Sequence, residues 1–164
     1  MPDDTERRDP FGLVSGEGVI TGTVVCAAAI AYSAGHTKSI ATLSALILGT
    51  VIVYWLAHLH AVTIGRAVNH RHHPLAAFEH ALAETWPIAG ASIVPLGVLL
   101  VAALLGAELK TAAWIALIAS IALLTAYSYV AGARGGLGLW GRLGSAVAGL
   151  ALGLLVVLLK VSLH

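Results

Sequence analysis

The chain has 164 residues and a formal net charge of +1. Hydrophobic residues make up 59% of it, charged residues only 10%, and the mean hydropathy is +0.91. Soluble domains carry about 25% charged residues, so this composition excludes an ordinary soluble domain and indicates a protein embedded in a lipid bilayer. The chain also lacks a basic stripe with interleaved aromatic residues, which argues against nucleic-acid binding.

A polar tail occupies residues 1–16. Acidic residues accompany Arg7 and Arg8 there, unlike the basic start of a signal peptide, so we expect the first apolar segment to be retained. A single transmembrane domain is predicted over residues 17–164.

Five apolar runs are long enough to cross the bilayer, which takes about 20 residues per helix. They lack the alternation of barrel strands, so only helices can satisfy their backbone groups in lipid. We therefore predict an all-α fold, a polytopic bundle of five transmembrane helices. The expected helices are residues 17–35, 39–66, 86–106, 111–132 and 140–160, with an interfacial helix over residues 74–85.

Positive charges in the connections predict the orientation of the bundle. With the N-terminus inside, all six arginines fall on the inner side, whereas Lys38, Lys110 and Lys160 fall on the outer side. The N-terminus is thus expected in the cytoplasm and the C-terminus outside. The excess of arginine over lysine, with abundant Ala, Gly and Val, favours a bacterial plasma membrane.

Polar residues inside the first two spans are candidates for function, because ionisable groups there are costly and usually face a bundle interior. Glu17 opens the first span with Thr21 one turn later, either as a hydrated carboxylate at a helix N-terminus or as part of a polar interior. Thr50, Tyr54 and His58 recur every four residues in the second span. We expect Glu17 and His58 to lie at similar depth and to pair. The stripe would line a conduit or hydrogen-bond a neighbouring helix.

Histidines cluster in the link after the second span. His72 and His73 precede Pro74, and His80 and Glu84 lie four residues apart. These four side chains are candidate metal ligands, although a histidine-rich loop against anionic lipid is the commoner explanation. The sequence contains no nucleophile elbow, phosphate loop or metalloprotease motif, so catalysis is the least favoured function and no cofactor is predicted.

Proline and small residues predict how the helices pack. Pro95 removes an internal hydrogen bond near the middle of the third span, which predicts a kink there. Small residues recur every four positions at Gly18 and Gly22 in the first span, and at Gly141, Ser145, Gly149 and Gly153 in the last. Such stripes let helices approach closely, within one chain or between copies in a homo-oligomer.

The sequence Trp-Leu-Ala-His at residues 55–58, preceded by Gly-Glu-Gly at residues 16–18, resembles a group of uncharacterised integral membrane proteins of actinobacteria. More distantly, it resembles the lysosomal and bacterial potassium channels with a Phe-Ser-Asp motif. Trp55 and His58 match a Trp and His in the second helix of those channels, and Glu17 stands near the place of their acidic residue. The resemblance implies a pore for a monovalent cation.

Three functions follow from these patterns. The first is an oligomeric channel or carrier for a small monovalent cation or proton, with Glu17, Tyr54, Trp55 and His58 in the polar interior. The second is a structural or assembly subunit of a membrane complex, whose polar residues join helices. The third is a metal-assisted membrane enzyme that uses the histidine-rich link. Transport ranks first and catalysis last.

Overall fold

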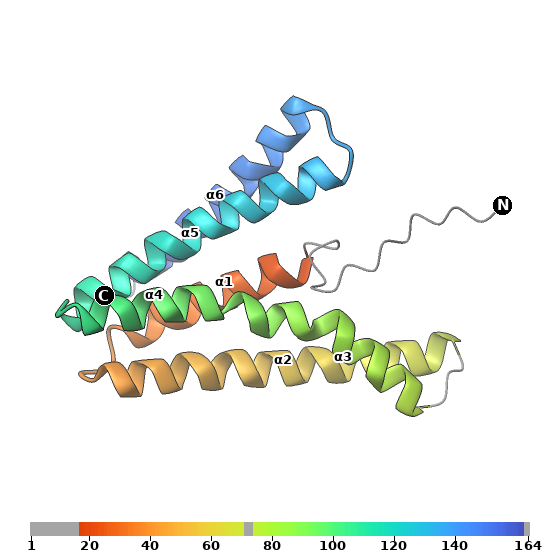
Figure 1. Ribbon diagram of the computed structural model, residues 1–164, viewed down its shortest axis with the longest axis horizontal. Coiled ribbons are helices and arrows are strands. Elements are labelled where there is room, and N and C mark those ends of the chain that lie inside the picture. The colour runs from red at the N-terminus through yellow and green to blue at the C-terminus, as the bar shows by residue number, and fades with distance from the viewer. Residues whose placement is uncertain (1–16, 71–73, 163–164) are drawn as a thin grey trace.

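The computed structural model describes residues 17–70 and 74–162 (Figure 1). Within these two ranges the chain is helical and contains no strand, which confirms the predicted all-α fold. Its helices are α1 (Glu17–Ser33), α2 (Ile40–His70), α3 (Pro74–Ala91), α4 (Ile93–Leu104), α5 (Leu109–Arg134) and α6 (Leu139–Ser162). The predicted polar tail, together with His72 and His73, lies outside the described residues.

Among the described residues, four apolar segments are long enough to cross a membrane. They are Ile40–Arg66, Phe78–Leu104, Leu109–Arg134 and Leu139–Ser162. The second of these combines most of α3 with α4. The remaining apolar helix, α1, has 17 residues and is about 25 Å long at about 1.5 Å per residue. The protein is therefore a multi-pass membrane protein, in which α1 is shorter than each of the four spans.

The short helix α1 lies at the centre of the bundle, where it packs against α2, α3, α5 and α6. Cys26, Ile30 and Ala31 of α1 are buried. Their neighbours in α1 are mostly Ala, Gly and Val, and such small side chains let helix backbones approach closely in a membrane. Large apolar side chains such as Leu104 and Leu155 are instead exposed on the outside, as expected for a surface in contact with lipid tails.

The third span differs from its predicted bounds. We expected an interfacial helix to end at residue 85 and a separate span to begin at residue 86, but α3 runs without interruption from Pro74 to Ala91. The expected boundary followed from the charge of Glu84, but glutamate is a good helix former, so the helix continues past it. Likewise α2 extends to His70, four residues beyond its predicted end.

The helix break falls seven residues later, at Ser92 between α3 and α4. Pro95, in the first turn of α4, has no N–H for the carbonyl group of Ala91, and its ring crowds the preceding turn, where the helix breaks. The backbone N–H and the hydroxyl of Ser92 both donate to the carbonyl oxygen of Ala89, at 3.3 and 2.7 Å. The interruption predicted from Pro95 is confirmed, and Ser92 satisfies part of the freed backbone.

The small-residue stripe of α6 packs against α5 of the same chain. An ideal Cβ atom at Gly149 would lie 2.8 Å from the carbonyl oxygen of Leu124, and one at Gly153 would lie 2.9 Å from Cγ1 of Ile121. Ser145 of α6 also packs closely against α5, because its Oγ would lie 2.8 Å from a Cβ at Gly132 of α5. Gly141, by contrast, meets Leu137 in the connection before α6. The antiparallel helices α5 and α6 (Figure 1) therefore pack so closely that a side chain at Gly149 or Gly153 would collide with α5.

The glycines of α1 serve the same purpose against α3. A Cβ at Gly22 would lie 2.9 Å from Cα of Ile88, and one at Gly18 would lie 3.4 Å from the side chains of Pro87 and Ile88. Both predicted stripes thus act within the chain. Because these small-residue stripes already contact helices of the same chain, a homo-oligomer would form through other surfaces.

Candidate functional site

Polar and aromatic side chains lie close together along α2, and one of them, Trp55, contacts α3. Tyr54, Trp55 and His58 of α2, with Thr85 and Trp86 of α3, are called the α2–α3 cluster below. Tyr54 and His58 lie one turn apart, and their rings stack with centroids 6.2 Å apart and planes 14° apart. Both side chains are partly exposed. The helical spacing that predicted this pair does bring the two rings together.

Trp55 joins α2 to α3. Its indole Nε1 donates a hydrogen bond to Oγ1 of Thr85 at 3.2 Å. Thr85 is buried, and its hydroxyl donates to the carbonyl oxygen of Ala81 at 2.8 Å. The ring of Trp55 also meets Trp86 edge to face, with centroids 5.9 Å apart and an interplanar angle of 81°. The indole N–H needs an acceptor when it leaves water, and Thr85 supplies it.

This contact predicts a measurable coupling between Trp55 and Thr85. In a double-mutant cycle of Trp55→Phe and Thr85→Val, we expect a coupling energy of about 1 kcal/mol, the usual net contribution of one hydrogen bond. The free energy of unfolding of the four proteins in detergent micelles gives this value. Additive effects would show that the hydrogen bond does not stabilise the packing of α2 against α3.

An ion pair between Arg66 of α2 and Glu84 of α3 also joins these two helices. Both Nε and Nη2 of Arg66 contact the same Oε2 of Glu84, and the Nε distance is 3.0 Å. The side chains are 35% and 50% exposed, so the pair contributes at most about 1 kcal/mol. The pair links α2 to α3 and places a positive charge beside the carboxylate of Glu84.

The other predicted polar residues are not assembled into one site. Thr50 is exposed on α2, and its hydroxyl donates to the carbonyl oxygen of Leu46 at 2.8 Å. Thr21 is partly buried on α1. The side chain of Glu17 lies outside the described part of the chain, so its pairing with His58 stays a prediction.

The proposed metal ligands are also spread apart where they are described. His80 is exposed on α3, and Glu84 is engaged by Arg66. Among the described side chains, no three His, Cys, Asp or Glu residues come close enough to hold a metal ion. A site involving His72 and His73 stays a prediction, since both fall between the two described ranges.

Several hydroxyl groups in the bundle interior are used within their own helices. Thr23 donates to the carbonyl oxygen of Val19 at 2.8 Å, and Ser120 donates to that of Ala116 at 2.7 Å. A hydroxyl bonded to the carbonyl group one turn earlier exposes little polarity to an apolar neighbour. These buried residues therefore support tight helix packing rather than a polar path.

Apolar runs, charge and helical spacing did not identify Thr85, Arg66 or the contact between Trp55 and Trp86 as parts of the site. One signal was available, since Arg66 and Glu84 are opposite charges on either side of the histidine-rich link. The contact of Trp55 with Thr85 had no such signal, because the two residues lie 30 positions apart on different helices.

Long apolar spans packed around a short central helix define an α-helical, multi-pass integral membrane protein. Comparison with protein-family models, curated proteins and solved structures finds no match to this chain. We therefore infer its function from its own geometry.

Proposed function

We propose that this protein is an oligomeric membrane channel or carrier for protons or a small monovalent cation, and that Tyr54 and His58 lie on its path. The observation that carries the proposal is the stacked Tyr54–His58 pair, which is partly exposed on a membrane-spanning helix. An ionisable residue within a span is by default a candidate for function.

The depth of His58 makes its exposure costly in lipid. It lies eight residues before Arg66, the end of the α2 span, which corresponds to about 12 Å at about 1.5 Å per residue. An imidazole group at that depth is stabilised by water or by a polar protein surface rather than by acyl chains. Partial exposure in a single chain thus favours a water-filled path or a second copy beside α2.

The chemistry of the stripe suits a path for protons or small cations. Tyrosine and histidine can both donate and accept hydrogen bonds, so they can hold a chain of water molecules or replace hydration around a cation. Thr50 continues the line one turn before Tyr54 and is exposed. Beside the stripe, Val53 and Leu56 expose 67% and 51% of their surface, which offers an apolar flank for a second copy. The resemblance to potassium channels at Trp55 and His58 supports the same proposal.

Flux across liposomes tests this proposal. We expect purified wild-type protein to conduct protons or potassium, and His58→Ala to reduce the flux by about tenfold, since one lost polar contact is worth about 1 to 2 kcal/mol and 1.36 kcal/mol is tenfold in rate. A pH-sensitive dye inside the vesicles measures proton entry under a potassium gradient with and without a potassium ionophore.

His60→Ala is the matched control. His60 is exposed and lies two residues from His58, on the opposite side of α2, so its replacement should leave the flux unchanged. Equal losses in the two variants, or no flux through the wild type, would overturn the proposed path.

A structural or assembly subunit is the second candidate function. Local hydrogen bonds of Thr23 and Ser120, and the Trp55–Thr85 contact, favour a role in which polar residues join helices. This function predicts a wild-type protein without flux that purifies in a fixed ratio with a second membrane protein.

A further inference from the structure

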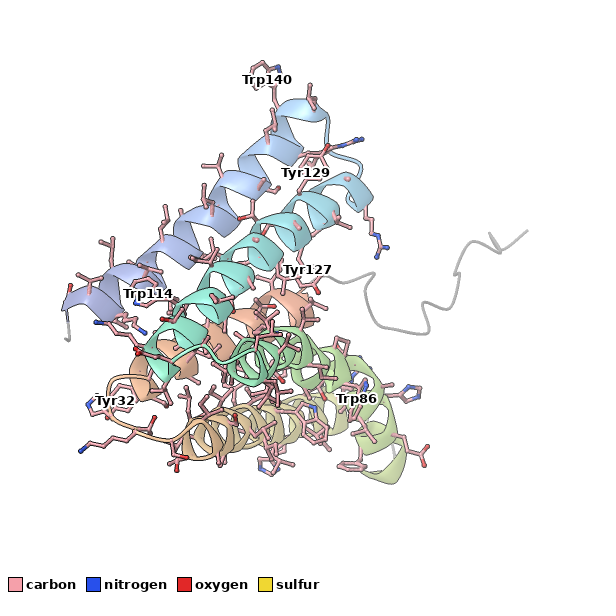
Figure 2. All side chains as sticks on the ribbon, turned by 60° about the vertical axis from the view of Figure 1, so that its left-hand side comes forward. Tyr32, Trp86, Trp114, Tyr127, Tyr129 and Trp140 are labelled. Carbon is pink, nitrogen blue, oxygen red and sulfur yellow. The ribbon has the colours of Figure 1, made fainter. Side chains whose placement is uncertain are left out.

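A cavity of about 430 Å³ opens at the end of the bundle where α1 ends, α5 begins and α6 ends. Its lining residues are Ala34, Gly35, Lys110, Trp114, Lys160 and Val161. Figure 2 shows Trp114 on α5 beside the last turns of α6, with Tyr32 at the same end of the bundle. Three segments far apart in the sequence therefore build one site.

The cavity concentrates positive charge. Lys110 and Lys160 both line it, and none of its six described lining residues is acidic. Nζ of Lys160 lies 5.1 Å from the ring centroid of Trp114, a cation–π distance that holds the ammonium group at the cavity wall. Glu108, two residues before Lys110, is exposed and not among the lining residues. Two ammonium groups that line one cavity attract an anion.

The position of the lysines matches the level of lipid headgroups. Lys110 is the second residue of α5, and Lys160 is the third residue from the end of α6. Lysine and tryptophan at the ends of membrane spans typically lie at the headgroup level. Val161 and the ring of Trp114 add an apolar wall beside the two charges.

We propose that this cavity binds a phosphate-bearing anion, and specifically the headgroup of an anionic phospholipid. The two lysines interact with the phosphate, while Trp114 and Val161 contact the apolar part of the lipid. Inorganic phosphate shares the charge but lacks that apolar part. This proposal is independent of any flux through the α2–α3 cluster.

Lipid retention measured by native mass spectrometry tests the site. Full-length protein in detergent is supplied with phosphatidylglycerol or phosphatidylcholine. We expect the wild type to retain phosphatidylglycerol preferentially, and Lys110→Gln with Lys160→Gln to retain it about 30-fold more weakly, since each lysine near an anionic lipid contributes about a fivefold effect. The charge-conserving pair Lys110→Arg and Lys160→Arg should keep the preference.

Lys38→Gln is the matched control, because Lys38 is an exposed lysine in the α1–α2 connection outside the cavity lining. Its retention of phosphatidylglycerol should equal that of the wild type. Each single glutamine variant should show about a fivefold loss, which keeps the test informative if the double variant fails to fold.

Three results would overturn the proposal. The first is equal retention of the two lipids by the wild type, and the second is an equal loss in Lys38→Gln and in the cavity variants. The third concerns the source of the anion. If inorganic phosphate displaces phosphatidylglycerol from the wild type at equal concentration, the site is one for a soluble anion rather than for a lipid.

Discussion

Replacing Gly22 with alanine is expected to destabilise the bundle by about 2 kcal/mol or more, the range of overpacking in a tight core. The added Cβ would lie 2.9 Å from the carbonyl carbon and the Cα atom of Ile88, and closer still to its carbonyl oxygen. Because these are backbone atoms of α3, no side-chain rotation can relieve the contact. The helices α1 and α3 would have to separate, and α1 is the helix that most of the others pack against.

Gly49→Ala is the matched control for Gly22→Ala. Gly49 lies inside α2, is exposed, and has no atom within 4 Å of an ideal Cβ. Alanine is favoured over glycine in a helix by about 1 kcal/mol, so this control should be neutral or stabilising. Reversible unfolding in mixed micelles with increasing sodium dodecyl sulfate measures both variants. A Gly22→Ala protein as stable as Gly49→Ala would contradict the close approach of α1 and α3.

The second large effect is expected at Gly149. Alanine there would place a Cβ 2.8 Å from the carbonyl oxygen of Leu124 and 2.9 Å from Cβ of Ser128, so the α5–α6 pair must open. We expect a loss of about 1 to 3 kcal/mol in the free energy of unfolding. Gly144→Ala on the same helix is the control, since Gly144 is exposed and its Cβ would meet nothing within 4 Å.

The Gly149 experiment also distinguishes packing within the chain from packing between copies. If α6 used its glycine stripe to meet a second copy, Gly149→Ala would change the oligomeric state and its stability would depend on protein concentration. We expect a loss of stability that is independent of concentration. A concentration-dependent loss would assign the stripe to an interface between copies.

Much of the architecture follows from local properties of the sequence. Uncharged apolar runs predict helices in lipid because each backbone group must be satisfied within its own segment. The four-residue spacing of Tyr54 and His58 likewise predicts their contact, since a helix places such residues on one face. Pro95 predicts the interruption at Ser92, because a missing N–H and a ring clash act on the preceding turn alone.

Other features could not be predicted from neighbouring residues. Both glycine stripes were recognised, but their partners, Ile88 for Gly22 and Leu124 for Gly149, depend on which helices lie side by side. The boundary expected at residue 85 was misplaced, because it was set at a charged residue, Glu84, and a glutamate does not end a helix. Neither glycine contact has a signature in the spacing of residues along the chain.

The sequence by itself determined that this is a helical membrane protein, where its apolar spans lie, which residues form one face of α2, and where the third span breaks. These properties depend on hydrophobicity and on helical period, which are local. Only the tertiary structure decided that α1 lies in the middle, that Trp55 bonds to Thr85, and that Lys110 and Lys160 share a cavity. These contacts join residues on separate helices, and the packing of small side chains, rather than any periodic pattern, determines which helices meet.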